Sequence, residues 1–557
     1  MLLLTILAFA VRVYRIDFNS LSEDEVAKWD AIQEYRHGHF TGVNSEHPML
    51  PKVLAWASLR AGESWTRAAE MHGWPFLKPE GWLRMPNVLF GAFAAAVLYL
   101  LCRRMMGVVG SFAAGFFWAV APLPVALNRL TKEETPLTFF TLVACYFYCR
   151  AKQANAAESA RRWYDLSAIG FGLAFASQYI LHLLGLNALA WLIAGKRGLS
   201  RNLSHFSCKR FYFVLFAAFI LVNPVVLSPA NFNAILHWLH HDGIRHNGYD
   251  FGGTLYFNFP GRLLAGVPWF YYVWLVLAKT PIPILIAVIV GSALLLRDRK
   301  TLASCFFLSL GIVQLAGLSV SGAKWIRYSL PMLPFLYLAG GYAVQETWKR
   351  AKGTWTPVFV GTTAVLLIGL PFAELHAWAP YYPFYLNSIG GGARNITRYF
   401  APDEVAEFDT NEVAQEISAL APAGTRVATA RPMSMGYYLG ASGRTDIQVV
   451  PLYDAHYAPQ NGDLIILEPS RRFFETQRYF DTLTGSGMSH SEVRVGPISA
   501  STIYRFDASV AEGRSMQEKF TLTRLRTVPP RFETDTQQAD ATRMSGGDFA
   551  QPSRRTQ

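Results

Sequence analysis

Three consecutive acidic residues, Glu23, Asp24 and Glu25, follow an apolar N-terminal segment and could accept a proton. Ionisable groups beside a membrane span are costly to keep there and are candidates for function. Partial burial can raise a carboxyl pKa into the range useful for taking a proton from a hydroxyl. Adjacent helical residues point about 100° apart, so one of Asp24 and Glu25 should face a given pocket. The alternative is an acidic first helical turn, capped by Ser20 or Ser22.

The composition places these acids in a membrane protein. Of 557 residues, 52% are hydrophobic and 16% are charged, which is too apolar for a soluble enzyme. A helix needs roughly 20 apolar residues to cross a bilayer. We expect about 11 spans, at residues 1–13, 86–102, 108–127, 135–149, 164–178, 180–195, 211–228, 281–297, 302–320, 327–346 and 356–373. The first is short, so its helix starts upstream of Met1 or lies shallow, and no signal-peptide cleavage site follows it.

Lysine and arginine collect in alternate loops, as they do on the cytoplasmic side of membrane proteins. The basic turns are residues 103–104, 150–162, 196–210, 297–300 and 349–352. Residues 14–83, 128–134, 228–280 and the chain after 372 then lie outside. We therefore expect a multi-pass protein of the inner (plasma) membrane with an extracytoplasmic C-terminal part.

The net charge of +12 suits anionic lipid headgroups, because much of the excess lies in the short inside loops. No nucleic-acid-binding module is recognisable. The five cysteines fall in or next to expected spans or inside loops, so no disulfide framework is implied.

The chain divides into three expected regions. Residues 1–375 form a transmembrane domain with functional loops at 14–83 and 229–280, residues 376–507 form a small extracytoplasmic α/β domain, and residues 508–557 form a polar, disordered tail. The α/β expectation comes from short β-prone runs that alternate with helical stretches. These runs are residues 426–429, 447–452, 463–467 and 503–506, and the helical example is 411–420.

Short polar motifs recur near the ends of the expected spans. They are Glu46-His47-Pro48, Arg84 with Pro86, Asn128-Arg129 with Glu134 and Pro136, His240-His241 with Arg245, His246, Gly248 and Tyr249, the run 268–272, Lys279-Thr280-Pro281, and Lys324, Arg327, Tyr328, Pro331 and Pro334. Together they resemble the family 39 glycosyltransferases, which include protein O-mannosyltransferases and aminoarabinose transferases of lipid A. The resemblance covers roughly residues 14–400 and implies an α-helical polytopic protein with the C-type glycosyltransferase fold.

The resemblance also implies roles for individual residues. Asp24 would be the catalytic base, with Glu25 beside it, and His47 would lie near the donor phosphate. Glu134 stands where members usually carry Asp, and its extra methylene moves the carboxylate away from the backbone. Gln178 stands where a Lys is expected, which removes one positive charge.

The implied reaction moves a monosaccharide from a polyprenyl phosphate to an acceptor hydroxyl, with inversion. Its leaving group is already acidic, so cations that stabilise the departing phosphate matter more than a general acid. Arginine suits a phosphate because its fork makes paired hydrogen bonds. The available cations are Arg245, Arg84, Arg129, Lys279, Lys324 and Arg327. Arg245 is preferred because it lies in mid-loop, whereas Arg84, Lys324 and Arg327 flank spans and could instead reach toward headgroups.

Metal binding is an alternative role for two groups of residues. His237, His240, His241 and His246 suggest zinc, but their spacing matches no tight structural zinc pattern. A divalent cation held by Asp24 or Glu25 is the second case, since some C-type enzymes use one. No other cofactor is implied. The aromatic run 269–272 would form an interfacial belt, or else a wall for the lipid or sugar.

Two other functions fit a polytopic chain. A transporter or flippase of a lipid-linked glycan should hold ionisable groups near the midplane of the bilayer, yet the expected spans are nearly free of Asp and Glu. A membrane glycan ligase or acyltransferase would use a different donor. The expected partners are a polyprenyl-phosphate sugar, membrane lipids and an acceptor on a protein, lipid A or an envelope glycan, among which the sequence does not choose.

Overall fold

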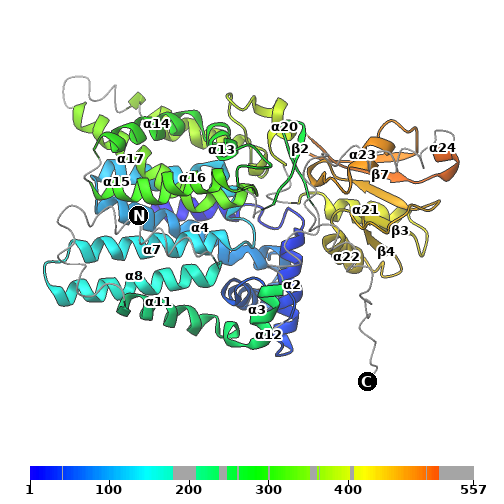
Figure 1. Cartoon of the computed structure of the whole chain (residues 1–557), viewed down its shortest axis with the longest axis horizontal. Coiled ribbons are helices and arrows are strands. Elements are labelled where there is room, and N and C mark those ends of the chain that lie inside the picture. The colour runs from blue at the N-terminus through cyan, green and yellow to red at the C-terminus, as the bar shows by residue number, and fades with distance from the viewer. Residues whose placement is uncertain are drawn as a thin grey trace.

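The computed structural model describes residues 1–40, 42–179, 209–237, 247–259, 263–298, 301–351, 361–362, 364–401, 407–496 and 498–512. A helical bundle precedes a C-terminal part that contains a five-stranded sheet, and the two lie side by side (Figure 1).

Apolar runs form the helices of the bundle. These are α1 (Leu2–Val13), α4 (Pro79–Arg103), α5 (Val108–Val120), α7 (Glu134–Lys152), α8 (Ala157–Ser177), α11 (Lys209–Val222), α14 (Ile282–Arg297), α15 and α16 (Leu302–Phe306 and Val313–Val320), α17 (Leu333–Arg350) and α19 (Leu370–Ala377). They coincide with the expected spans, in part for 356–373, whereas span 180–195 lies outside the described residues. Among the described helices, Pro79–Arg103 and Leu302–Val320 are each long and apolar enough to cross a bilayer, and four apolar helices are shorter.

Five expected spans are not continuous α-helices. Span 211–228 ends in a 3₁₀ segment, Pro224–Leu227, and span 356–373 contains a π-helical segment, Val365–Gly369. Span 108–127 breaks between α5 and α6 (Pro122–Leu127), because Pro122 has no N–H to donate to the preceding turn. Span 302–320 contains a π-helical segment, Phe307–Ile312. Span 327–346 begins with a 3₁₀ segment, Ile326–Met332, which contains Pro331.

The loop helices that carry the N-terminal acids lie at the end of the bundle nearer the sheet. They are α2 (Glu23–Arg36) and α3 (Met49–His72), and α12 (Pro229–His237) lies beside them. The basic turn between α7 and α8 lies at the opposite end (Figure 1). The acidic loop and a basic turn are therefore separated along the length of the bundle.

The C-terminal sheet has the strand order β4-β3-β5-β7-β6. Strand β3 (Arg426–Thr429) is parallel to β4 (Gln448–Pro451) and β5 (Leu464–Leu467), whereas β7 (Ile498–Arg505) is antiparallel to β5 and β6 (His490–Val495). Helices α21 (Thr410–Leu420), α22 (Pro432–Ala441) and α23 (Gln477–Leu483) accompany it. The four expected strands and the expected helix at 411–420 are confirmed, and β6 is additional. Residues 508–512, expected to be disordered, form the short helix α24 (Ala508–Glu512), and the rest of that tail lies outside the described residues.

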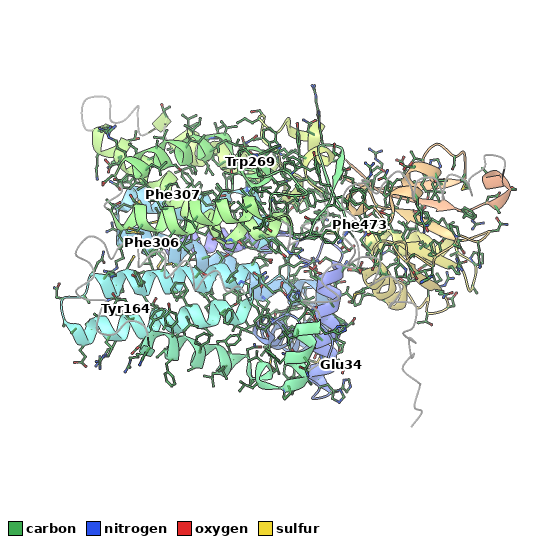
Figure 2. The ribbon with its side chains drawn as sticks, viewed as in Figure 1. Glu34, Tyr164, Trp269, Phe306, Phe307 and Phe473 are labelled. Atoms are coloured by element: carbon green, nitrogen blue, oxygen red, sulfur yellow. The ribbon has the colours of Figure 1, made fainter. Side chains whose placement is uncertain are left out.

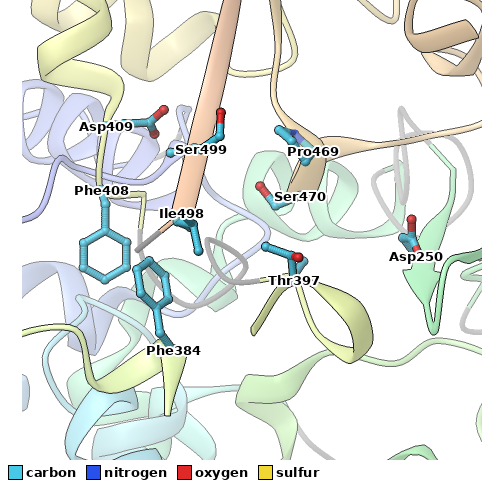
Figure 3. A pocket seen from close by; sticks show the side chains of 11 residues that line it. Asp250, Phe384, Thr397, Phe408, Asp409, Pro469, Ser470, Ile498 and Ser499 are labelled. Carbon is cyan, nitrogen blue, oxygen red and sulfur yellow. The ribbon is translucent and has the colours of Figure 1, made fainter. Parts of the chain in front are cut away.

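Direct contacts join the bundle to the sheet region. Phe473 lies at this junction (Figure 2), and the next residue, Phe474, donates its N–H to Asn247 O at 2.8 Å. A cavity at the same junction is lined from both sides, by Asp250 of the hairpin strand β1 (Tyr249–Phe251) and by Ser470 among others (Figure 3). The relative position of the two parts is thus fixed by packing and hydrogen bonds.

The aromatic run at 269–272 is divided between surface and core. Trp269 is 62% exposed and lies near α13 (Tyr271–Lys279) in Figure 2, whereas Tyr271 and Tyr272 are fully buried. An interfacial belt position suits Trp269, but the two tyrosines pack inside the bundle.

Candidate active site

The three acids occupy the first turn of α2 and point in three directions. Ser22 caps the helix, with its backbone N–H donating to Glu25 Oε2 at 3.0 Å. Glu23 points toward the C-terminal part, Asp24 toward the loop before α7, and Glu25 into the bundle. The acids therefore form a capped helical turn, as the alternative expected, and they also face three separate surroundings.

Asp24 lies among cations from three elements. Its Oδ2 pairs with Lys132 Nζ and lies 3.5 Å from Arg327 Nη1. Lys28, one turn along α2, donates to the main-chain oxygen of Asp24 at 3.3 Å. The Asp24 side chain is 43% exposed and Arg327 is 22% exposed, whereas Lys132 is almost covered. A carboxylate and a guanidinium are thus both accessible at one place.

Asp24, Lys132 and Arg327 form a cluster, and a second set of charges lies beside it. Lys28 Nζ lies 2.8 Å from Glu133 Oε1, and His47 Nδ1 lies 3.7 Å from the same oxygen. Burial alone would raise the pKa of Glu133, but Lys28, His47 and Lys132 lower it to about 2. Glu133 is therefore ionised near neutral pH, where its charge offsets those of Lys28 and Lys132.

Arg327 connects Asp24 to Glu134. Its Nε lies 3.4 Å from Glu134 Oε1, and Gln178 Nε2 donates to the same oxygen at 3.4 Å. Within the described part of the chain, Glu134 Oε2 and Gln178 Oε1 are buried without a hydrogen-bond partner. Glu134 and Gln178, the two residues that differ from the family pattern, thus contact each other beside Arg327.

The cations set the protonation state of Asp24. Burial alone would raise the pKa of this carboxyl, but Lys132, Arg327 and Lys28 hold it well below its usual value. Burial also lowers the pKa of His47, so its imidazole is mainly neutral near pH 7. Asp24 is therefore ionised and able to accept a proton, although the cations weaken it as a base.

Glu25 and Arg84 form a buried pair outside this cluster. Arg84 Nε and Nη2 donate to Glu25 Oε1 and Oε2, both at 2.8 Å, and both side chains are fully buried. Glu25 also accepts the N–H of Thr131 at 2.9 Å. This saturated carboxylate holds α2, α4 and the loop before α7 together.

Three other expected phosphate ligands bind main-chain carbonyls. Arg129 donates to the carbonyls of residues 12, 14 and 15, Lys279 to those of residues 383 and 385, and Lys324 to those of residues 318, 319 and 321. All three are buried. The structure thus joins His47, Arg327 and Glu134 to Asp24, but gives Glu25, Arg84, Arg129, Lys279 and Lys324 other partners.

Arg245, His240, His241 and His246 lie outside the described residues, whereas His237, the fourth histidine of the group, is the last residue of α12. Among the described residues, no group of three or more His, Cys, Asp and Glu side chains could hold a metal. Asp24 faces cations and Glu25 is saturated by Arg84. Among the described residues, neither is therefore surrounded by the several oxygen ligands that a divalent cation takes.

Sequence reasoning missed Lys28, Lys132 and Glu133. The helical spacing of Lys28, four residues after Asp24, was an available signal, because i and i+4 share a helix face. Lys132 and Glu133 lie in a short polar segment between two spans, and nothing in their spacing distinguishes them from a solvated turn.

Comparisons with known proteins bear on the family and the fold of the chain. Residues 76–227 match the family model described as dolichyl-phosphate-mannose-protein mannosyltransferase. A comparison with curated protein sequences found no match. Apo ArnT of Cupriavidus metallidurans superposes with a TM-score of 0.52 at 16% identity, over 91% of this chain and 98% of that one.

Two further solved structures share the fold. ArnT bound to undecaprenyl phosphate gives a TM-score of 0.50 at 14% identity, over 90% of this chain and 97% of that one. An oligosaccharyltransferase of Archaeoglobus fulgidus tethered to an acceptor peptide gives 0.51 at 10% identity, over 91% and 74%. The family model thus matches one part of the chain, residues 76–227, and over the whole chain the fold is similar to that of ArnT, so the chain resembles the membrane glycosyltransferases of this family.

Proposed function

We propose that the protein transfers a monosaccharide from a polyprenyl-phosphate donor to an acceptor hydroxyl, with inversion, on the extracytoplasmic face of the inner (plasma) membrane. The observation that carries the proposal is the accessible Asp24 carboxylate beside Arg327 and Lys132. It combines a proton acceptor with cations for a phosphate. The undecaprenyl phosphate bound by the ArnT neighbour supports a donor of this class.

The chemistry needs one bond made and one broken. The acceptor oxygen attacks the anomeric carbon from the face opposite the phosphate, the bond from that carbon to the phosphate oxygen breaks, and its electron pair leaves with the phosphate. Arg327 and Lys132 stabilise the departing charge. The hydroxyl proton passes to Asp24.

Donor binding would also change the pKa of Asp24. In the cluster as described, Arg327 and Lys132 hold the Asp24 pKa low. A phosphate anion that shares these two cations would leave less positive charge for Asp24, so its pKa would rise toward that of a useful base. Base strength would then be greatest when the donor is in place.

Glu134 and Gln178 are the proposed contacts of the donor sugar. Each has a buried oxygen without a partner among the described residues, and Arg327 links them to Asp24. Hydroxyl groups of a sugar can satisfy such acceptors. His47, 30% exposed, would lie near the phosphate or the sugar on the other side of the cluster.

The direct test is to incubate purified protein with a panel of radiolabelled polyprenyl-phosphate hexoses and pentoses and a membrane extract. We expect label to move from one donor into a protein, lipid or glycan fraction. Wild-type protein that consumes no donor of the panel would contradict the proposal and favour transport of a lipid-linked glycan.

Arg327→Ala is expected to raise the donor KM by about 10- to 150-fold, because a hydrogen bond to a charged group contributes about 1.5–3 kcal/mol. Initial rates measured against donor concentration give this value. Arg327→Lys keeps the charge but not the fork, so its KM should lie between those of Arg327→Ala and wild type. An unchanged KM in Arg327→Ala would remove Arg327 from the phosphate site.

A further inference from the structure

The residue before the proposed base is bound by the C-terminal part of the chain. Glu23 Oε1 accepts the N–H of Ser434 at 2.7 Å and its hydroxyl at 2.9 Å. Ser434 lies in the first turn of α22, whose unpaired N–H groups favour a carboxylate. The sheet region therefore forms direct hydrogen bonds with the first turn of α2.

Two more charges complete this contact. Glu407 Oε1 accepts the N–H of Glu23 at 3.3 Å, and Glu407 Oε2 lies 3.1 Å from the hydroxyl of Ser434. Arg471 pairs with Glu407 and supplies the positive charge. We name Glu23, Ser434, Glu407 and Arg471 the interdomain cluster.

Hydrogen bonds flank the interdomain cluster on its N-terminal side. Leu21 donates its N–H to the hydroxyl of Tyr438, also on α22, at 2.8 Å. Asn411, in the first turn of α21, donates its N–H to Ser20 Oγ at 3.0 Å. The segment that leads into α2 is thus held at successive points by the sheet region.

We infer that Glu23 is a positioning residue, through which the C-terminal part holds α2 in the orientation that directs Asp24 at Lys132 and Arg327. This inference rests on the proposed function of Asp24. Glu23 fixes one side of the helical turn and Glu25 the other, so Asp24 between them has little freedom to rotate. Helix α2 also buries Val26 and Ile32 in a core shared with the C-terminal part, so apolar packing holds the helix against that part and the polar contacts of Glu23 fix its first turn.

The first test compares Glu23→Ala and Glu23→Gln in the full chain. Glutamine keeps an acceptor oxygen for the N–H of Ser434, whereas alanine does not. We expect Glu23→Ala to lower kcat tenfold or more, since a misplacement of about 1 Å can cost about 100-fold, with donor KM unchanged. Glu23→Gln should restore most of kcat. Wild-type kcat in a folded Glu23→Ala protein, or a loss confined to KM, would overturn the inference.

Ser434→Ala, in the first turn of α22, and Ser442→Ala, at the C-cap of the same helix, are a matched pair. Among the described residues, the hydroxyl of Ser442 donates to Tyr438 O at 2.9 Å, one turn earlier, and makes no contact with Glu23, so its loss should leave kcat unchanged. Ser434→Ala removes one of the two hydrogen bonds to Glu23 and should lower kcat less than Glu23→Ala does. Equal kcat in Ser434→Ala and Ser442→Ala would contradict a role for the interdomain cluster in catalysis.

Hydrogen–deuterium exchange separates this inference from the proposed function. Glu23→Ala should speed exchange in residues 20–27 while leaving β3 and β5 unchanged, whether or not a donor is known. Faster exchange in a protein that transfers no sugar would reject the proposed function and keep the structural coupling. Unchanged exchange at 20–27 would reject the coupling itself.

The interdomain cluster should also respond to pH. Burial and the facing charge of Glu407, offset by Arg471, raise the pKa of Glu23 to about 7. An unfolded chain releases this proton near pH 4.3. The contribution of Glu23 to stability is therefore complete below about pH 4.3 and lost as the pH rises through about 7. The Tm of wild type should fall more than that of Glu23→Gln between about pH 5 and pH 8; parallel profiles would contradict the assignment.

Discussion

Asp24→Asn is expected to lower sugar transfer by about 10²- to 10⁴-fold, the usual contribution of a general base. Asparagine has the same shape but cannot take the proton of the acceptor hydroxyl. It also removes a negative charge beside Lys132 and Arg327, so donor phosphate should bind at least as tightly. Single-turnover rates with labelled donor, together with binding of undecaprenyl phosphate, would measure both effects.

Asp30→Asn is the matched control for that variant. This substitution makes the same chemical change on the same helix, about two turns further along. Asp30 is half-buried and lies away from Lys132 and Arg327. Its transfer rate should equal that of wild type. Full activity in Asp24→Asn would refute the base assignment, and a matching loss in Asp30→Asn would point to damage to α2.

Much of the fold could be predicted because its signals are local. The length of an apolar run sets where a bundle helix begins and ends, so residues 135–149 anticipated α7, and short β-prone runs anticipated β3 and β5. Strand β6 was missed because it is an edge strand whose side chains are mostly exposed and polar.

The candidate site was only partly predictable, because a cation's role depends on what it faces. Arg327 and Arg84 both lie near span ends and look alike in the sequence. The chain folds so that Arg327 faces an open carboxylate, whereas Arg84 faces Glu25 and three main-chain carbonyls. The difference between the partners of Arg327 and those of Arg84 arises from the tertiary structure, and it cannot be predicted from residue type and spacing.

Arg84→Met is expected to destabilise the protein by about 3–5 kcal/mol, the usual cost of removing one partner of a buried ion pair. Arg84 also donates to the carbonyls of Ile16, Asn19 and Ser20 at 3.1, 3.0 and 2.7 Å. Its loss leaves these groups and the Glu25 carboxylate without their donors. The Tm in detergent should fall well below that of wild type.

The double variant Arg84→Met with Glu25→Leu separates charge from packing. It removes the uncompensated carboxylate, so it should recover part of the stability lost in Arg84→Met. Arg84 holds Glu25 at a pKa of about 2 against the effect of burial, so this carboxylate stabilises the fold above about pH 4.3 and loses that contribution only as the pH falls toward 2. Recovery in the double variant would mean that Arg84 and Glu25 chiefly compensate each other's buried charge. No recovery would mean that the carbonyl contacts of Arg84 hold the segment before α2, on which the position of Asp24 depends.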